Sequence, residues 1–131
     1  ARVNVGGRLD HALLQESILG KTLVFCDCEG GEYELLSTSA VPALARADMI
    51  VELHGVRGYP QRAREWLDTF SRTHVISLLH QGERNPAAIP EIASWKHLDQ
   101  LLAMWEFRGE PTPWAWLRSK AGESSGDGDC R

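Results

Sequence analysis

The stretch from Thr22 to Gly31, TLVFCDCEGG, decides the fold. Its first five residues form an almost continuous apolar run, and two glycines follow soon after. A run without alternation is typical of a strand that is buried on both faces, as in a parallel sheet covered by helices. Glycines behind such a strand fit a tight turn into a helix. We therefore predict a buried strand over Thr22–Cys26 within an α/β fold.

Two more segments of this kind follow along the chain. Met49–Leu53 and His74–Leu79 indicate buried strands, and the segment between them, which starts at Pro60, has apolar residues at helical spacing. The order strand, helix, strand, helix, strand predicts an α/β domain with parallel pairing. The remaining predicted elements are a strand over Val3–Val5, a helix from Leu9 to Gly20, a short helix from Pro42 and a loop over residues 80–93.

The last part of the chain is less regular. Leu101–Phe107 fits a helix or a strand equally, because periodicity alone does not separate the two in so short a run. Glu110–Leu117 holds two prolines, and we predict an irregular segment whose tryptophans pack back onto the body. Residues 121–131 have no large apolar side chain and are predicted to be disordered. We expect one domain over residues 1–120, followed by a disordered tail over 121–131.

Length and composition narrow the class of protein. The 131 residues suit one compact domain, and 14 Lys and Arg against 18 Asp and Glu give a net charge of −4, which argues against a dedicated nucleic-acid binder. No apolar run reaches the roughly 18 to 20 residues of a membrane-spanning helix, and no signal-peptide pattern opens the chain. The three cysteines are an odd number, which speaks against a disulfide framework. We expect a cytoplasmic protein with no nucleic-acid or membrane partner.

Polar side chains follow two of the predicted strands where each strand ends. Asp27, Cys28 and Glu29 come after the first strand, and Glu52 and His54 close the second. Because ligands of open α/β sheets bind outside the carboxyl ends of the strands, we expect these side chains to meet on one rim. A carboxylate beside an imidazole suits general-base chemistry, since a hydroxyl or amine loses a proton as it attacks. The structural alternative is that Asp27 and Glu29 cap the next helix.

Two hypotheses of a metal site arise from residues at or near this rim. Asp27, Glu29, Glu52 and His54 could hold a hard divalent cation, because oxygen ligands with one imidazole suit Mg²⁺ or Mn²⁺. No tight ligand spacing supports that site, so a metal-dependent enzyme stays an alternative and the main prediction includes no metal. Cys26-x-Cys28 looks like half of a zinc site without its second pair, and we predict a buried strand thiol and a turn residue instead.

The segment Phe25–Leu36, FCDCEGGEYELL, resembles the D-x-E-G-[AG]-E-x-x-x-L block of FkbM-type S-adenosylmethionine-dependent methyltransferases. Three other stretches are similar to that family in order and spacing. Gly7–Leu14 looks like its T-L-D-D-L-L helix, and Ala47–His54 looks like its next strand, which ends E-x-H. Trp105–Arg108 followed by Trp114 is similar to its closing strand, E-x-R…W. The resemblance covers roughly residues 7 to 117.

The resemblance implies half of a Rossmann-like class I methyltransferase sheet, whose full strand order is 3-2-1-4-5-7-6. The half present would be strands 4-5-7-6, with strand 7 antiparallel and helices flanking the sheet. Under this alignment Thr22–Asp27 is strand 4, Met49–Leu53 strand 5, His74–Leu79 strand 6 and Leu101–Phe107 strand 7. The family holds its cofactor with a glycine-rich turn after strand 1 and an acidic residue after strand 2. This chain has neither, so it resembles the C-terminal half, and its cofactor-binding residues are unknown.

The function that the resemblance implies is O- or N-methyl transfer from S-adenosylmethionine to a small molecule or sugar, with the donor-binding half absent from this chain. The implied catalytic residues are Asp27, Glu29 and His54, and the implied acceptor contacts are Cys28, Glu52 and Trp114. A non-catalytic module that forms oligomers or binds a ligand is the alternative from another class of protein.

The implied topology leaves one strand edge without its usual partner. Strand 4 pairs with strand 1 in the family, and without it an apolar strand would expose a bare edge, which proteins avoid by pairing or covering it. We expect either that Val3–Val5 folds onto this edge or that a second copy pairs with it across a two-fold axis. The second arrangement makes the protein a homo-oligomer.

Overall fold

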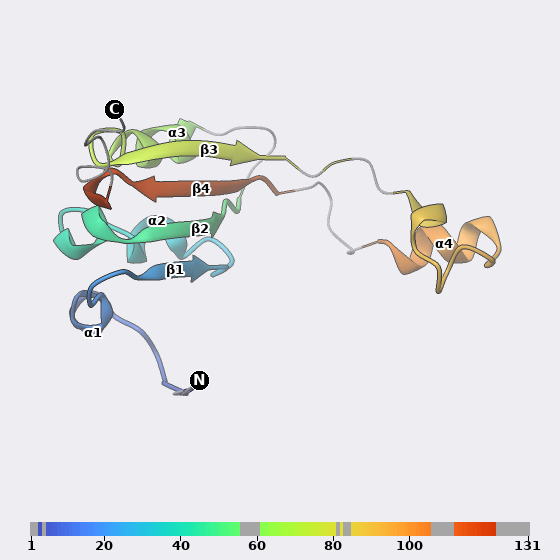
Figure 1. Cartoon of the computed structure of the whole chain (residues 1–131), viewed down its shortest axis with the longest axis horizontal. Coiled ribbons are helices and arrows are strands. Elements are labelled where there is room, and N and C mark those ends of the chain that lie inside the picture. Colours follow the sequence, from blue (N-terminus) through green and yellow to red (C-terminus); the bar gives the residue numbers. More distant parts are fainter. Residues whose placement is uncertain are drawn as a thin grey trace, which may run out of the picture.

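The computed structural model describes residues 3, 5–55, 61–80, 82, 85–105 and 112–122. Among these residues, four strands form one sheet in the order β1-β2-β4-β3 (Figure 1). The strands are β1 (Leu23–Cys26), β2 (Asp48–Glu52), β3 (His74–Leu79) and β4 (Trp114–Ser119). β1 and β2 are parallel, whereas β4 runs antiparallel to both of its neighbours. The predicted α/β class is confirmed.

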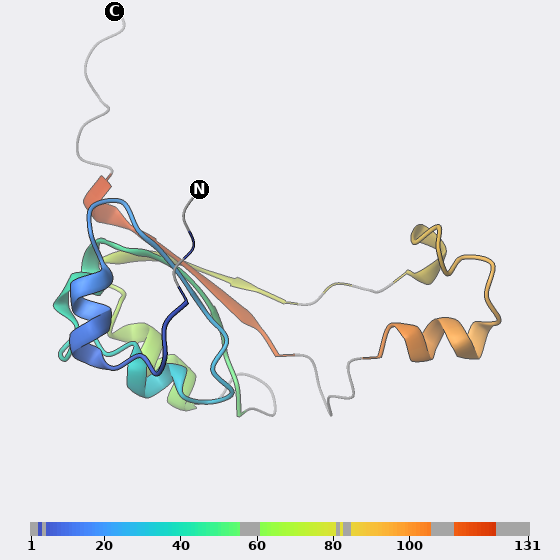
Figure 2. The same cartoon turned by 90° about the horizontal axis from the view of Figure 1, so that it is seen from below.

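Three helices cover one face of this sheet (Figure 2). They are α1 (His11–Ser17), α2 (Glu32–Leu35) and α3 (Gln61–Asp68), and the 3₁₀ helix η1 (Pro42–Arg46) precedes β2. The core lies between the helices and the sheet, where the side chains of Met49, Val51 and Leu117 are fully buried. Of the helices in the described ranges, none combines the length and the apolar character that crossing a bilayer requires.

The helical spacing after Pro60 predicts the buried face of α3 correctly. Ala63, Trp66, Leu67 and Phe70 are all buried. The Trp66 indole Nε1 donates a hydrogen bond of 3.0 Å to the Leu36 carbonyl, which satisfies the polar end of a buried ring. Burial of this stripe holds α3 against the sheet, because a helix of eight residues gains most of its stability from packing.

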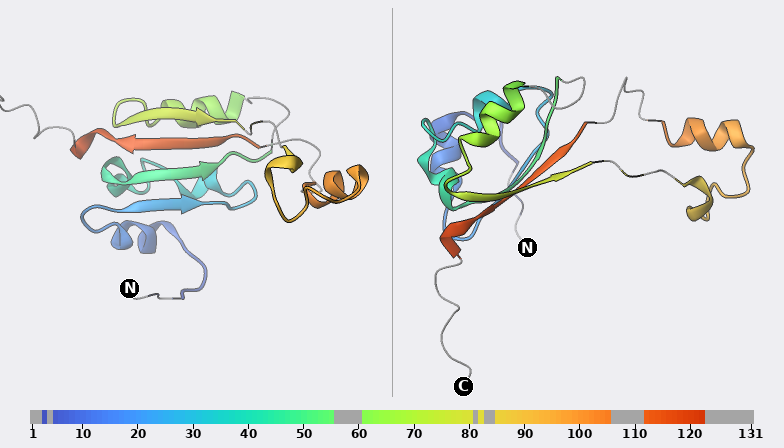
Figure 3. Two further views of the ribbon diagram at one scale, coloured as in Figure 1. Left: turned by 45° about the vertical axis from the view of Figure 1, so that its right-hand side comes forward. Right: turned by 90° about the horizontal axis from the view of Figure 1, so that it is seen from above.

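The assignment of Leu101–Phe107 to a strand is wrong for the residues that the structure describes. Leu101 to Ala103 belong to helix α4 (His97–Ala103), and Glu106 and Phe107 lie outside the described residues. α4 and the short helix η2 (Pro86–Ala88) lie away from the sheet (Figure 3).

The strand between β2 and β3 is instead β4, which lies in the segment predicted to be irregular. Pro113 precedes Trp114 and so removes no hydrogen bond from the ladder, and Pro111 lies outside the described residues. From Trp114 on, the burial alternates, with Ala115, Leu117 and Ser119 buried against the helices. The predicted disordered tail begins inside the 3₁₀ helix η3 (Lys120–Gly122), and residues 123–131 lie outside the described part of the chain.

β1 is a strand of the sheet, as predicted, but it is buried on one face only. Leu23 and Phe25 are 56% and 65% exposed, because the described helices lie on the other face of the sheet. β1 also forms one edge of the sheet. The predicted strand at Val3–Val5 does not cover it: Val3 and Val5 lie outside any strand and are exposed, and Asn4 is outside the described residues.

With Val3 and Val5 excluded, we expect a second copy to pair with β1. In a two-fold strand pair Phe25 lies near its own symmetry mate, so Phe25→Lys places like charges close together and prevents pairing. Sedimentation velocity should show a dimer for the wild type and a monomer for this variant. Leu79→Lys, on the opposite edge strand β3, is the control and should stay dimeric. A monomeric wild type, or a dimer that only Leu79→Lys dissociates, would contradict the pairing.

Candidate active site

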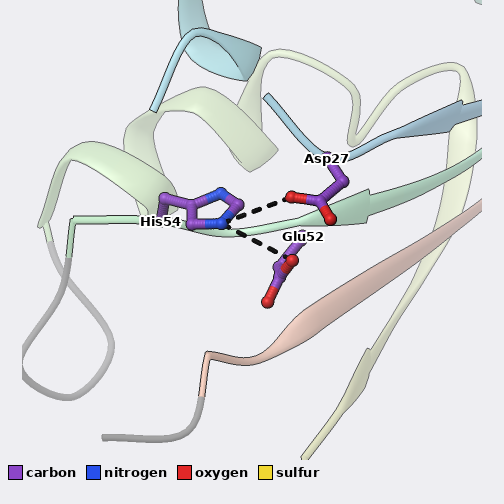
Figure 4. A group of neighbouring side chains, drawn as sticks. All are labelled: Asp27, Glu52 and His54. Carbon is purple, nitrogen blue, oxygen red and sulfur yellow. Dashed lines mark ion pairs between the residues drawn. The ribbon is translucent and has the colours of Figure 1, made fainter. Parts of the chain in front are cut away.

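The parallel pairing of β1 and β2 brings Asp27, Glu52 and His54 together at one rim of the sheet (Figure 4). Cys26 and Val51 are partners in the register, so the residues that follow them are neighbours. The Nε2 atom of His54 lies 3.4 Å from Asp27 Oδ1 and 3.5 Å from Glu52 Oε2. The structure thus assembles three of the six predicted site residues in one cluster.

His54 is the centre of this cluster. Its side chain is 8% exposed, and it lies among four carboxylates. Nε2 is also 3.5 Å from Glu29 Oε2, and Nδ1 is 3.5 Å from Glu32 Oε1. Neither ring nitrogen has a hydrogen-bond partner among the described residues. The ring is thus surrounded by acidic side chains from the ends of β1 and β2 and from α2.

Glu29 borders this cluster and has an unusual backbone conformation. Its φ angle is 48°, in the left-handed region, and the next residue, Gly30, has φ 101°. A non-glycine residue in this region is strained, and such strain is often found at functional sites. The carboxylate of Glu29 is 79% exposed at the mouth of the site. The strained turn at Glu29 and Gly30 therefore directs the Glu29 carboxylate toward His54.

The helix-capping role considered for Asp27 and Glu29 is wrong. The N-cap residue of α2 is Gly31, and no side chain accepts a hydrogen bond at this cap. The two carboxylates face His54 instead. Their position beside an imidazole is what the functional interpretation of these residues expects.

Sequence reasoning missed two residues that hold His54 in place. Glu32 is fully buried; its Oε1 accepts a hydrogen bond of 2.9 Å from the His54 backbone N–H, and its Oε2 accepts one of 2.9 Å from the Gly30 N–H. The Tyr33 hydroxyl donates to the His54 carbonyl at 3.0 Å. Both lie in the acidic block of the family resemblance, and the position of Glu32 directly after two glycines is the signal that could have singled it out.

The carboxyl groups of Glu52 and Asp27 form a hydrogen-bonded pair. Glu52 is 3% exposed, and its Oε1 accepts a hydrogen bond from the Thr112 hydroxyl, a third residue that the sequence did not indicate. The Asp27 side chain is 40% exposed. Partial desolvation raises the pKa of Asp27, and the hydrogen bond with Glu52 and the charge of that carboxylate raise it further. The raised pKa makes Asp27 a stronger base than a carboxylate with the ordinary pKa.

The other predicted acceptor contacts lie around the cluster. Trp114 is the register partner of Glu52, and its ring lies 5.2 Å from that of Phe25. Cys28 lines a groove of about 570 Å³ with residues of the segment before α1 and of α2. This groove does not include Asp27, Glu52 or His54, so it borders the acidic turn from another side. Trp114 thus lies close to the cluster, whereas Cys28 faces the groove.

The two neighbouring thiols should differ in reactivity. Burial raises the pKa of the Cys26 thiol, and its contact with Cys28, at an Sγ–Sγ distance of 3.4 Å, raises it further. Cys28 is exposed. Since the thiolate is the reactive form, iodoacetamide should alkylate Cys28 in the folded protein and leave Cys26 unmodified. Tandem mass spectrometry locates the label, and unfolded protein, in which both should react, is the control. Equal labelling of both in the folded protein would refute this difference.

Comparison with known proteins adds no further assignment. No protein-family model, curated protein or solved structure matches this chain.

Proposed function

We propose that this chain forms the acceptor-facing part of an FkbM-type methyltransferase domain that acts on a hydroxyl or amine of a small molecule or sugar. The observation that carries the proposal is the convergence of Asp27 and His54 at the carboxyl ends of neighbouring parallel strands. This rim is where open α/β sheets bind their ligands. Carboxylate and imidazole groups are suited to take up the proton that an acceptor loses.

The sheet lends the proposal further support. The order β1-β2-β4-β3 with β4 antiparallel agrees with the order that the family resemblance implies for strands 4-5-7-6. In this comparison Trp114–Ser119, rather than Leu101–Phe107, corresponds to strand 7. Order alone does not define a reaction, since one sheet topology serves many functions. The acidic rim is therefore the stronger argument.

The described residues do not fit a site for the donor, S-adenosylmethionine. Gly6 and Gly7 are exposed and follow no strand among the described residues. Gly30 follows β1 and has a φ of 101°, so the positive φ of the turn accounts for this glycine. We accordingly derive no step through the donor and restrict the mechanism to the acceptor.

In the proposed mechanism, Asp27 contacts the acceptor and removes its proton. Asp27 is partly exposed, whereas His54 and Glu52 are buried behind it. The imidazole lies within ion-pair distance of Asp27 and holds that carboxylate at the rim. The proton passes from the acceptor heteroatom to an Asp27 oxygen, which leaves the acceptor a better nucleophile. Glu32 and Tyr33 position His54 through its backbone.

The test is transfer of label from S-[methyl-³H]adenosylmethionine. The protein, in the longest form that its gene encodes, is incubated with this donor and a panel of sugars, hydroxylated molecules and amines. Labelled product is the expected result. If no acceptor of the panel is labelled, and if calorimetry detects no binding of S-adenosylhomocysteine at millimolar concentration, the proposal is overturned. The non-catalytic module is then favoured.

A further inference from the structure

We propose that Asp27, Glu52 and His54 bind one divalent cation of the Mg²⁺ or Mn²⁺ type at the rim of the sheet. Each of the three residues offers one ligand atom, and these atoms lie within 4.8 Å of one another. In Figure 4 the imidazole and the two carboxylates face a common point between the ends of β1 and β2. The residues come from two neighbouring strands, so the sheet itself fixes their spacing.

The distances in the cluster fit a shared cation better than direct hydrogen bonds. A charge-assisted N–H···O bond is about 2.7–2.9 Å long. His54 Nε2 lies farther than that from both carboxylates, at 3.4 Å from Asp27 Oδ1 and 3.5 Å from Glu52 Oε2. Two ligands held about 2.1 Å from one ion are about 3.0 Å apart in an octahedral site and about 3.4 Å apart in a tetrahedral one. The observed spacing of 3.4–3.5 Å is wider than the octahedral value, so the three side chains would move a few tenths of an ångström closer together on binding Mg²⁺ or Mn²⁺.

The imidazole of His54 is an independent pointer to a bound group. The side chain is more than nine-tenths buried, and both ring nitrogens lack a hydrogen-bond partner among the residues that the structure describes. Buried polar atoms in proteins are nearly always satisfied, and an exception calls for a missing partner such as water or an ion. Nε2 is aimed at Asp27 and Glu52, so an ion bound between the three residues would satisfy it.

Groups behind the cluster orient the proposed ligands. The Thr112 hydroxyl donates to Oε1 of Glu52, and Oε2 is the oxygen that faces His54. The buried Glu32 carboxylate lies 3.5 Å from Nδ1 of His54, on the side of the ring away from the proposed ion. Metal-binding histidines commonly turn their second nitrogen toward a carboxylate, which fixes the orientation of the ring. His54 therefore has the surroundings of a ligand that binds through Nε2.

The chemistry of the donor set indicates the type of ion. Two carboxylates with a single imidazole favour hard cations such as Mg²⁺ and Mn²⁺, whereas sites rich in thiolate or imidazole favour zinc and copper. Cys26 and Cys28 contact each other and are not members of the cluster. Glu29, at 3.5 Å from Nε2, adds a further negative charge at the mouth. A dication would offset this concentration of carboxylates.

Cation binding itself does not require methyl transfer, but the use that we infer for the ion rests on the proposed function. Because Asp27 is partly exposed, the cluster opens toward solvent on that side. An acceptor oxygen can approach the ion there and complete its coordination. A bound cation lowers the pKa of a hydroxyl that ligates it, so the acceptor would lose its proton more readily. The inferred acceptor class is then an alcohol or a diol.

The experiment titrates Mn²⁺ into the EDTA-stripped, dialysed full chain and follows the electron paramagnetic resonance signal of free Mn²⁺. One bound ion per chain is expected, together with a rise in the melting temperature, because the ion binds the folded state. Asp27→Asn and His54→Gln should each raise the Kd at least tenfold. Asp68→Asn and His97→Gln, which change exposed residues of α3 and α4, should leave the Kd unchanged.

The outcomes separate this site from the proposed function. Wild type that binds no Mn²⁺ at millimolar concentration, or binding that survives Asp27→Asn unchanged, would overturn the cation site. Asp27 is on the surface of the site, so this variant keeps the test valid where His54→Gln fails to fold. Label transfer without Mn²⁺ binding leaves the methyltransferase proposal intact and refutes the cation. Mn²⁺ binding without label transfer to any acceptor leaves the cation site intact and refutes the methyltransferase proposal.

Discussion

Replacing Asp27 by asparagine is expected to lower the rate of the proposed methyl transfer by roughly 100-fold or more. The amide of asparagine has almost the shape of the carboxylate but does not take up a proton. Asp27 is the most accessible of the three clustered residues, since Glu52 and His54 are buried behind it. The measurement is the initial rate of label transfer to the best acceptor of the panel, for the wild type and the variant.

Two comparisons show whether the loss of rate is specific to Asp27 and which role of Asp27 causes it. Asp68→Asn, an exposed residue of α3, is the matched control and should keep the wild-type rate. Adding excess Mn²⁺ separates the two roles of Asp27: recovery of the rate indicates that the carboxylate acts mainly as a ligand, and no recovery indicates that it takes up the proton. A variant that transfers label at the wild-type rate without added Mn²⁺ would rule out both roles.

The strands that build the site could be predicted because their sequences carry local signals. The apolar run before Asp27 and the one before Glu52 form adjacent parallel strands, and the general rule for the carboxyl ends of such strands then brings both carboxylates to one rim. His54 follows from the same reasoning. What the sequence lacked was any sign that β1 would have one bare face, because burial of a strand depends on which helices the rest of the chain supplies.

The errors come from signals that local sequence does not contain. In Leu101–Phe107, apolar residues fit either period, and the family alignment selected the wrong one; the first three of these residues are helical. The alternation that does form a strand, in Trp114–Ser119, followed two prolines that suggested irregular structure. Glu32 was missed because its partner, the His54 backbone N–H, lies 22 residues away along the chain. Such a contact is visible only once the two strand ends are placed side by side.

Replacing Glu32 by alanine is expected to lower the free energy of unfolding by about 2–4 kcal/mol. The carboxylate is fully buried and accepts the backbone N–H groups of Gly30 and His54, each at 2.9 Å. Alanine leaves both donors without an acceptor and creates a cavity next to the ring of His54. The loss is measured by guanidinium denaturation followed by circular dichroism. Glu32→Gln keeps the volume and one acceptor oxygen, so its loss should be smaller.

Glu34→Ala is the control for this effect, because Glu34 lies two positions along the same helix and its side chain is exposed. Removing it should change the free energy of unfolding by no more than about 0.5 kcal/mol. Equal losses for the two variants would mean that helix α2, and not the buried carboxylate, sets the stability. A selective loss at Glu32 would mean that one side chain ties the strained turn after β1 to the end of β2. The geometry of Asp27 relative to His54 would then depend on a residue that contacts neither acceptor nor cation.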